Sequence, residues 1–303
     1  MLAKAFAGSK SHKILINAWF TTLPGQCQKP IVQFVLSPIL VSTNLTPSIL
    51  SLPVQEKSSS SFVMAYRLVV APEQIIEATV TLTTAQLHYL QRVLRLQKGD
   101  GFMVLDGGGG VWRAQLNDLA HGTAQLLETV SEQNELPLPV TLAIALPKGS
   151  GFEEIIRPCT ELGATAFQPL LTERTLLKPS QNKLERWQRI VTEAAEQSER
   201  QWLPPVAAPL TFGQFVEKVA GPETLALLCV TRLNSPMLGA YLKQSNLPAQ
   251  IVLATGPEGG WTDNEISLAI AKGFQPVSLG KRILRAVTAP TVALAQINAL
   301  LES

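Results

Sequence analysis

The chain has 303 residues, 46% of them hydrophobic, which is enough for a globular protein of two modest domains. Three scattered cysteines and three histidines without a shared spacing argue against a disulfide scaffold, a structural zinc site and a Cys–His dyad. The net charge is +2, and the longest apolar runs fall well short of the roughly 20 residues that a membrane span needs.

Residues 1–63 differ from the rest in composition. They are rich in Ser, Thr and Pro and contain five lysines and one acid, Glu56, so the following 240 residues carry 20 basic and 22 acidic side chains. We expect a disordered extension or an over-extended start with Met64 as the alternative first residue, and therefore a cytoplasmic protein. The alternative is an organelle transit peptide, although the arginine typical of transit peptides is missing.

Residues 64–136 predict a small β-barrel-like domain. One helix, at residues 84–96, interrupts short runs with strand character. Asp106 and the four glycines after it separate two such runs, and a hairpin turn is favoured over a phosphate loop because no helix follows. The strand-like runs are residues 66–70, 78–82, 101–105, 111–115 and 123–129.

The helix at residues 84–96 has two different faces. On a helical wheel His88, Arg92 and Arg95 fall within about 60° of one another, and three leucines occupy the opposite side. The basic face is either simply solvated or a stripe that contacts a nucleic-acid backbone, because a chain without global positive charge needs a local basic patch to bind RNA. The inward leucines are Leu87, Leu90 and Leu94, and a stripe that contacts nucleic acid could also include the cations Arg67, Lys98 and Arg113.

Residues 137–303 predict an α/β domain with a parallel sheet. Pro137 and Pro139 indicate a linker, since neither can donate to a ladder, and strand-like and helix-like segments alternate after it. The predicted strands are residues 140–146, 165–171, 224–230, 251–255 and 276–279, and the predicted helices are residues 152–162, 181–199, 262–272 and 290–301.

Two loops of this domain predict a ligand site. Residues 256–260 (GPEGG) directly follow a buried strand, and residues 280–285 (GKRILR) follow the last strand. Thr262 and Glu265 have the spacing of a capping box, which predicts the start of the helix that separates the two loops. Both loops should leave the same edge of the sheet, where open α/β folds bind their ligands.

Several stretches, in this order along the chain, resemble the ribosomal RNA small subunit methyltransferase E family of the knotted SPOUT superfamily. The resemblance covers residues 66–301. The matching stretches are His88 with Arg92-Val93-Leu94-Arg95, Lys148-Gly149, Glu161-Leu162-Gly163, Glu173-Arg174, Glu196-Gln197-Ser198 with Arg200, Gly256-Pro257-Glu258-Gly259-Gly260, and Leu279-Gly280 with Arg282-Ile283-Leu284-Arg285.

The resemblance implies a PUA-like RNA-binding domain, a methyltransferase domain with a trefoil knot at residues 137–303, and a homodimer. It implies S-adenosylmethionine as methyl donor, no metal, and the small ribosomal subunit as partner. The reaction implied is methylation of N3 of one uridine in 16S rRNA, uridine 1498 in the customary numbering.

The resemblance also assigns residues to roles. Arg282 and Arg285 would stabilise a developing uracil anion or hold a phosphate, and no general base is evident. Glu258 is open to three roles: donor ligand, substrate contact, or acid at a helix N-terminus. The implied donor-binding residues are Thr255, Gly256, Glu258, Gly259, Gly260, Leu279, Gly280, Ile283 and Leu284. The implied RNA contacts are Arg67, His88, Arg92, Arg95, Lys148, Arg174 and Arg200, the last two with dimer contact as the alternative.

Two loops depart from the family pattern. After Arg285 the family usually has Thr-Glu-Thr-Ala, whereas this chain has Ala286-Val287-Thr288-Ala289. After Lys148 the usual acid–base pair is replaced by Ser150-Gly151. These departures bear on the details of the donor and RNA contacts and not on the fold. Two rival functions stay open: a ribose 2′-O-methyltransferase of the same superfamily and a non-catalytic ribosome-assembly factor. A dinucleotide-binding enzyme is disfavoured, because no strand–GxGxxG–helix unit occurs.

Overall fold

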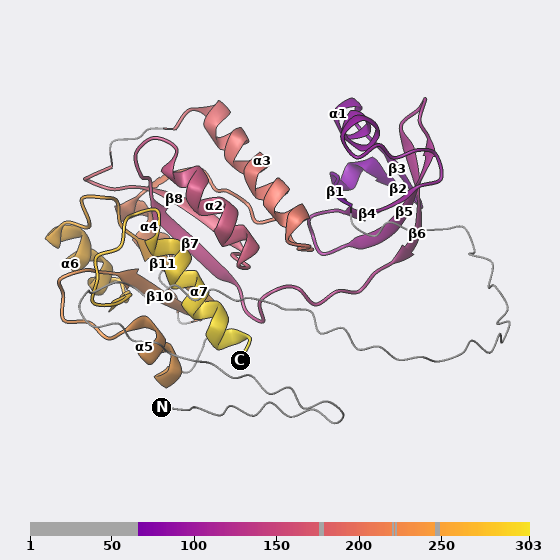
Figure 1. Ribbon diagram of the computed structural model, residues 1–303. Helices are drawn as coiled ribbons and strands as arrows, with labels where there is room; N and C mark the ends of the chain where they lie inside the picture. Colours follow the sequence, from indigo (N-terminus) through magenta and orange to yellow (C-terminus); the bar gives the residue numbers. More distant parts are fainter. Residues whose placement is uncertain (1–65, 176–178, 220, 222, 246–248) are drawn as a thin grey trace, which may run out of the picture. The chain divides into compact units, whose positions relative to one another are not determined.

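The computed structural model describes residues 66–175, 179–219, 221, 223–245 and 249–303, and it contains two separate six-stranded sheets (Figure 1). Predictions for residues 1–63 lie outside the described residues. No helix in the described ranges is long and apolar enough to cross a membrane.

The first sheet is mixed. Its hydrogen-bonded order is β1-β4-β5-β6-β3-β2, with β1 and β4 parallel and every other pair antiparallel. This sheet is the domain that we predicted to be β-barrel-like, and the first and last strands of its hydrogen-bonded order are β1 and β2. The strands are β1 (Arg67–Val69), β2 (Ile75–Ile76), β3 (Thr79–Thr81), β4 (Gly101–Leu105), β5 (Val111–Asp118) and β6 (Thr123–Thr129), and the short 3-10 turn Pro72–Gln74 precedes β2.

The predicted regular helix at residues 84–96 was wrong in one respect. Helix α1 (Thr84–His88) begins with a capping box between Thr83 and Gln86, but a π-helical turn, Tyr89–Val93, follows it directly. Arg95 lies beyond that turn with φ 60°, so the basic residues do not follow the 3.6-residue period. The leucines face inward as predicted: Leu90 is fully buried, and Leu87 and Leu94 pack against the same core.

The second sheet is parallel throughout, as predicted. Its order is β12-β10-β11-β7-β8-β9. The strands are β7 (Val140–Ala145), β8 (Ala166–Leu171), β9 (Leu210–Thr211), β10 (Thr224–Cys229), β11 (Gln250–Thr255) and β12 (Gln275–Val277).

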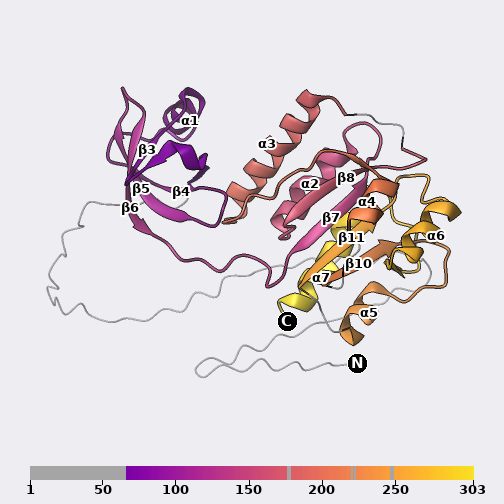
Figure 2. The same cartoon turned by 180° about the vertical axis from the view of Figure 1, so that it is seen from behind.

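Helices cover both faces of this sheet, because successive strand residues point to opposite sides. Leu142 and Ile144 belong to a core built with α2 (Gly151–Glu161), α3 (Gln181–Gln197), α5 (Leu238–Gln244) and α7 (Ala289–Leu301). Ala143 and Ala145 belong to the opposite core, built with α4 (Phe212–Val219) and α6 (Asp263–Ala271). Figures 1 and 2 show the two layers from opposite sides.

Candidate active site

The glycine loop at residues 256–260 follows β11 and folds back on the end of β10. The indole Nε1 of Trp261 donates to the carbonyl of Cys229 over 2.9 Å. Gly256 lies against that indole, because a Cβ there would stand only 3.2 Å from the ring. Gly260 has φ 69°, a conformation that glycine adopts without strain, and its N–H donates to the carbonyl of Pro257 over 2.8 Å. The loop is therefore a tight, closed turn.

The Glu258 side chain connects this loop to the loop that follows β7. Its Oε1 accepts the backbone N–H of Lys148 over 3.0 Å. The start of α6 is instead capped by Thr262 and Glu265, whose reciprocal hydrogen bonds confirm the predicted capping box. In the structure, Glu258 joins two loops, which is a contact that was not among the three roles left open for it.

The loop after β12 extends from one side of the sheet toward β7. At its start, Ser278 donates its N–H to the carbonyl of Pro236 and accepts the N–H of Leu238. Near its end, Val287 stands 3.0 Å from where a Cβ of Gly151 would be. The two departures from the family pattern, Val287 and Gly151, thus meet in space.

This path carries the chain across the ends of two strands. Between β12 and β7 lie β10 and β11, so the distance to cross is three strand spacings, or roughly 14 Å. Residues 278–287 begin at β12 and reach the loop after β7, which Glu258 contacts from the glycine loop. Both predicted loops therefore meet the loop after β7 at the carboxyl edge of the sheet.

The predicted catalytic arginines lie on the second loop. Arg282 and Arg285 are exposed, and neither forms an ion pair with a carboxylate of the described residues. The carbonyl of Arg285 accepts hydrogen bonds from the N–H groups of Thr288 and Ala289, so the backbone of Arg285 is fixed just before α7. Between the two arginines, Ile283 is 65% exposed, which is unusual for a large apolar side chain and offers an apolar surface to a ligand.

The hydroxyl of Thr255 is a polar atom without a partner at the end of β11. The residue is 2% exposed, and its Oγ1 has no hydrogen-bond partner among the described residues. An unsatisfied buried hydroxyl costs free energy, so it points to a polar group that is supplied from outside the chain.

The two cysteines of the described residues, Cys159 and Cys229, are free thiols. Burial raises the pKa of the Cys229 thiol to about 12, and burial likewise raises that of Cys159 to about 12. Both thiols are protonated near neutral pH and are poor nucleophiles. Within the described residues, no group of three His, Cys, Asp or Glu side chains is arranged to hold a metal ion.

Two of the arginines predicted to contact RNA are internal. Arg67 pairs with Glu132 at 2.7 Å and with Glu199 at 3.1 Å, and its side chain is only 6% exposed. Arg200 is 2% exposed, pairs with Glu135 and donates to buried carbonyls. These guanidinium groups are engaged within the chain, so we omit both arginines from any RNA-binding surface.

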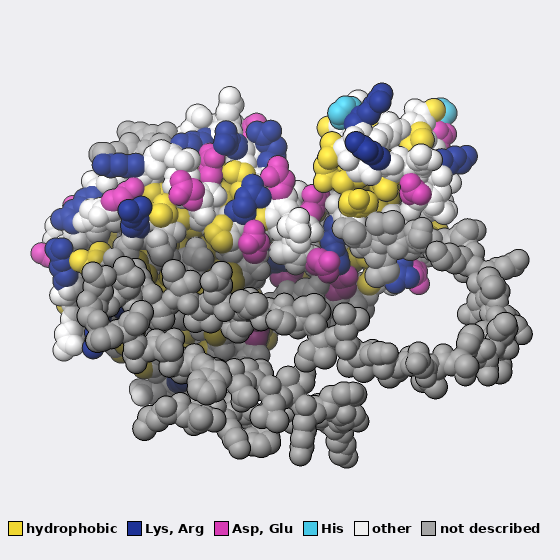
Figure 3. Space-filling model, in the orientation of Figure 1, with side chains coloured by type: hydrophobic (Ala, Val, Ile, Leu, Met, Phe, Trp, Pro, Cys, Tyr) yellow, Lys and Arg dark blue, Asp and Glu magenta, His cyan; other side chains and the backbone are white. Residues whose placement is uncertain are grey.

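The other predicted RNA contacts are exposed. His88, Arg92 and Arg95 lie on and after α1, and Lys148 lies in the loop after β7. Around α1, the face in Figure 3 shows His and Lys or Arg side chains beside hydrophobic ones. Arg174 is exposed too, but its guanidinium donates to backbone carbonyls of the glycine loop.

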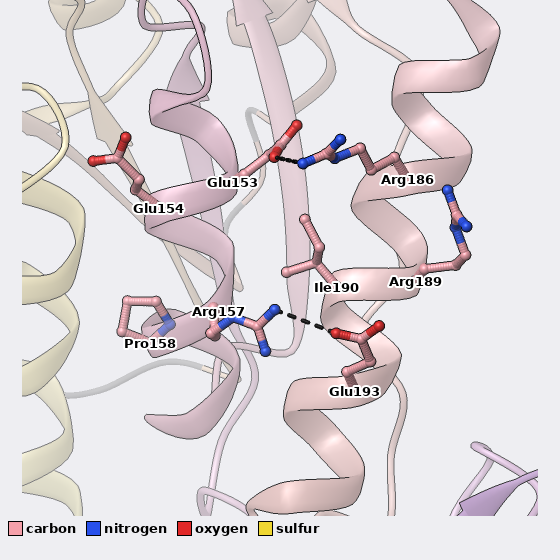
Figure 4. A pocket seen from close by; sticks show the side chains of 8 residues that line it. All are labelled: Glu153, Glu154, Arg157, Pro158, Arg186, Arg189, Ile190 and Glu193. Atoms are coloured by element: carbon pink, nitrogen blue, oxygen red, sulfur yellow. Dashed lines mark hydrogen bonds and ion pairs between the residues drawn. The ribbon is translucent and has the colours of Figure 1, made fainter. Parts of the chain in front are cut away.

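A separate hollow of about 570 Å³ lies between α2 and α3 (Figure 4). We did not predict it from the sequence. It is lined by three arginines and three glutamates, and four of these six pair with each other, Arg186 with Glu153 at 2.8 Å and Arg157 with Glu193 at 3.3 Å. With its charges balanced, this hollow has no excess charge to attract a charged ligand, and it lies apart from the loops described above.

Comparison with known families places both parts of the chain. The model of an RNA methyltransferase domain matches residues 134–298, and that of an RNA methyltransferase PUA domain matches residues 82–128. Ribosomal RNA small subunit methyltransferase E of Bacillus subtilis is 32% identical over 77% of this chain and 95% of its own length. The protein of the same name from Rickettsia conorii is 34% identical over 71% of this chain and 86% of its own length.

Solved structures agree with the sequence relatives. A ribosomal RNA small subunit methyltransferase E from Neisseria gonorrhoeae, bound to S-adenosylmethionine, is 33% identical with a TM-score of 0.71 over 78% of this chain and 97% of its own. A Legionella pneumophila structure with S-adenosylmethionine as bound cofactor is 28% identical, with a TM-score of 0.70 over 78% and 98%. The chain belongs to the ribosomal RNA small subunit methyltransferase E family of RNA methyltransferases.

Proposed function

We propose that this protein transfers a methyl group from S-adenosylmethionine to N3 of one uridine of 16S rRNA, uridine 1498 in the customary numbering, in the small ribosomal subunit. The observation that carries the proposal is that both predicted loops contact the loop after β7 at the carboxyl edge of the parallel sheet, with exposed arginines on one and a glycine turn on the other. The names of the relatives support the RNA substrate.

The residues at this edge fit a methyl donor with an adenosine and a methionine part. Gly260 leaves the backbone of the first loop open to close approach, because a Cβ there would meet nothing within 4 Å, whereas Gly256 and Gly259 let that backbone pack on Trp261 and Arg174. The orphaned hydroxyl of Thr255 supplies a polar contact, and Leu279, Gly280, Ile283 and Leu284 form the second wall. When bound there, S-adenosylmethionine supplies an electrophilic methyl group on a sulfonium ion.

The chain's contribution to the reaction is mainly positioning and charge. Holding the uracil nitrogen in line with the methyl group can lower the barrier by about 7–11 kcal/mol in favourable cases. N3 must lose a proton, and Arg285 and Arg282 stabilise the resulting negative charge on the ring. Val287 stands where the family usually has a carboxylate, so this position holds no general base.

The RNA backbone would be held by exposed basic side chains, namely His88, Arg92, Arg95 and Lys148.

We further propose that the protein is a homodimer in the cytoplasm. We also propose a trefoil knot, formed where the segment after β12 crosses the segment that joins β10 to α5. Ser278 pairs with residues 236–238 at that crossing. A ribose 2′-O-methyltransferase is the second candidate, because Arg282 and Arg285 would stabilise an alkoxide equally well.

Methyl transfer from labelled S-adenosylmethionine to unmethylated small subunits and to naked 16S rRNA tests the proposal. We expect label in 3-methyluridine, and a loss of roughly 10²-fold in turnover for Arg285→Ala, the size seen when one electrostatic stabiliser is removed. Label on a ribose oxygen would establish the second candidate. Full turnover by Arg285→Ala would reject the role of that arginine.

A further inference from the structure

Arg174 makes a different contact from the RNA contact predicted for it. It follows β8, and its Nη1 donates to the carbonyl of Gly259 and, over 3.3 Å, to the carbonyl of Trp261. Its aliphatic part lies along the glycine, since a Cβ on Gly259 would stand 3.0 Å from Cδ of Arg174. One side chain from a neighbouring loop thus spans the second half of the glycine loop.

These bonds fix the peptide that joins Gly259 to Gly260. Its carbonyl accepts from Arg174, and its N–H donates to Pro257 within the turn. Because a peptide is planar, holding both of its polar ends sets the orientation of the whole unit. The loop is also held on its other side, where Glu258 accepts the N–H of Lys148.

The backbone that follows β8, from which Arg174 extends, is itself anchored. The N–H of Glu173 donates to Oε1 of Glu265 over 3.0 Å, and Glu265 is the buried carboxylate that caps α6. Arg174 therefore extends from a fixed backbone, and a single nitrogen of its guanidinium, Nη1, reaches both carbonyls.

We propose that Arg174 is a positioning residue for methyl-donor binding, which holds the Gly256–Gly260 loop in its binding shape, and that it is not a contact to the RNA backbone. This rests on the proposed function, in which that loop binds S-adenosylmethionine. A glycine loop without such ties would sample many conformations, and the binding-competent one would be a minor part of them.

Titration calorimetry on the full chain with S-adenosylmethionine, together with RNA binding as a function of salt, separates the two roles. For Arg174→Ala we expect donor affinity to fall about ten- to a hundredfold, while RNA affinity and its salt dependence stay unchanged. Arg174→Lys keeps the charge, but its nitrogen lies one bond nearer to the backbone than Nη1, so it should recover only part of the donor affinity. Arg189→Ala, which removes an exposed arginine on α3, is the matched control and should bind the donor normally.

Each failure has its own signature. If Arg174→Ala binds the donor as the unsubstituted protein does, the positioning role is overturned. If Arg174→Ala binds RNA more weakly, and the plot of log binding constant against log salt concentration has a slope shallower by about one, Arg174 contacts a phosphate instead. If the unsubstituted protein itself does not bind S-adenosylmethionine, the proposed function fails, and this result is distinct from both others. Thermal unfolding of each variant confirms that a lost affinity does not reflect a lost fold.

Discussion

At the scale of single residues, Thr255 combines two opposing effects. Its hydroxyl is buried without a partner, which costs free energy in the unliganded protein, and it stands at the entrance to the glycine loop. The same hydroxyl would be satisfied when the donor binds. Stability and binding should therefore respond in opposite directions when it is removed.

For Thr255→Val we expect unliganded stability to be equal or slightly higher, by up to about 1 kcal/mol, and donor affinity to fall several-fold. Chemical denaturation and titration calorimetry measure the two quantities. Thr255→Ser retains the hydroxyl and should retain most of the affinity. Unchanged donor binding by Thr255→Val would show that the hydroxyl does not contact the donor.

The role of an individual arginine was the least predictable feature from sequence. Arg200 and Arg285 look alike in the sequence, since each is a basic residue in a motif of the family. What separates them is a carboxylate distant in sequence: Glu135 stands 65 positions before Arg200 and pairs with it. Local patterns do not contain such long-range pairings.

At the scale of elements, the four-glycine turn between β4 and β5 is the predicted hairpin. Leu105 and Val111 form the last pair of the ladder, and Asp106 accepts N–H groups from Gly108 and Gly110. The close packing of the turn explains its glycines. A Cβ on Gly110 would stand 2.2 Å from the Trp112 ring and 2.6 Å from the Asp106 carboxylate.

Gly110→Ala should therefore destabilise the protein by about 1–3 kcal/mol through overpacking. Gly213, in α4, is the matched control because a Cβ there meets nothing within 4 Å. Gly213→Ala should stabilise by up to about 1 kcal/mol through helix propensity. Thermal unfolding should shift the two variants in opposite directions, and a neutral Gly110→Ala would show that the turn relaxes freely.

Strong periodic elements were predictable, and short or irregular ones were not. The runs of β7, β8, β10 and β11 were placed within a residue or two because each is apolar and bounded by turn residues. Helix α5 has only seven residues, too few to show a periodicity. The π-helical turn after α1 was also missed, because a one-residue insertion into the helical ladder leaves no local signature in composition.

At the scale of the whole molecule, a half-buried carboxylate on α3 forms a hydrogen bond with the first sheet. Glu196 on α3 accepts the N–H of Val69 in β1 over 2.7 Å. Burial raises the pKa of this carboxyl above its ordinary value of 4.5, although the hydrogen bond from Val69 opposes the shift. A raised folded-state pKa means that ionisation is less favourable in the folded than in the unfolded chain.

This glutamate should make stability depend on pH. Its ionisation destabilises the fold as pH rises through the unfolded and folded pKa values, and the cost disappears below both. Glu196→Gln keeps an acceptor without a charge, so it should be more stable than the unsubstituted protein near pH 7. The difference should vanish below pH 4.5. Thermal unfolding across that range checks it, and a constant difference would contradict the buried charge.

Hydrogen exchange of the full-length chain, with and without S-adenosylmethionine, tests most directly whether the loops at the carboxyl edge of the parallel sheet bind the methyl donor. We predict new protection in peptides that contain residues 146–151, 255–261 and 278–288, with little change in the basic region around α1. Protection confined to the α2–α3 hollow lined by Glu153 and Arg186, or no protection at all, would contradict a donor site between these loops.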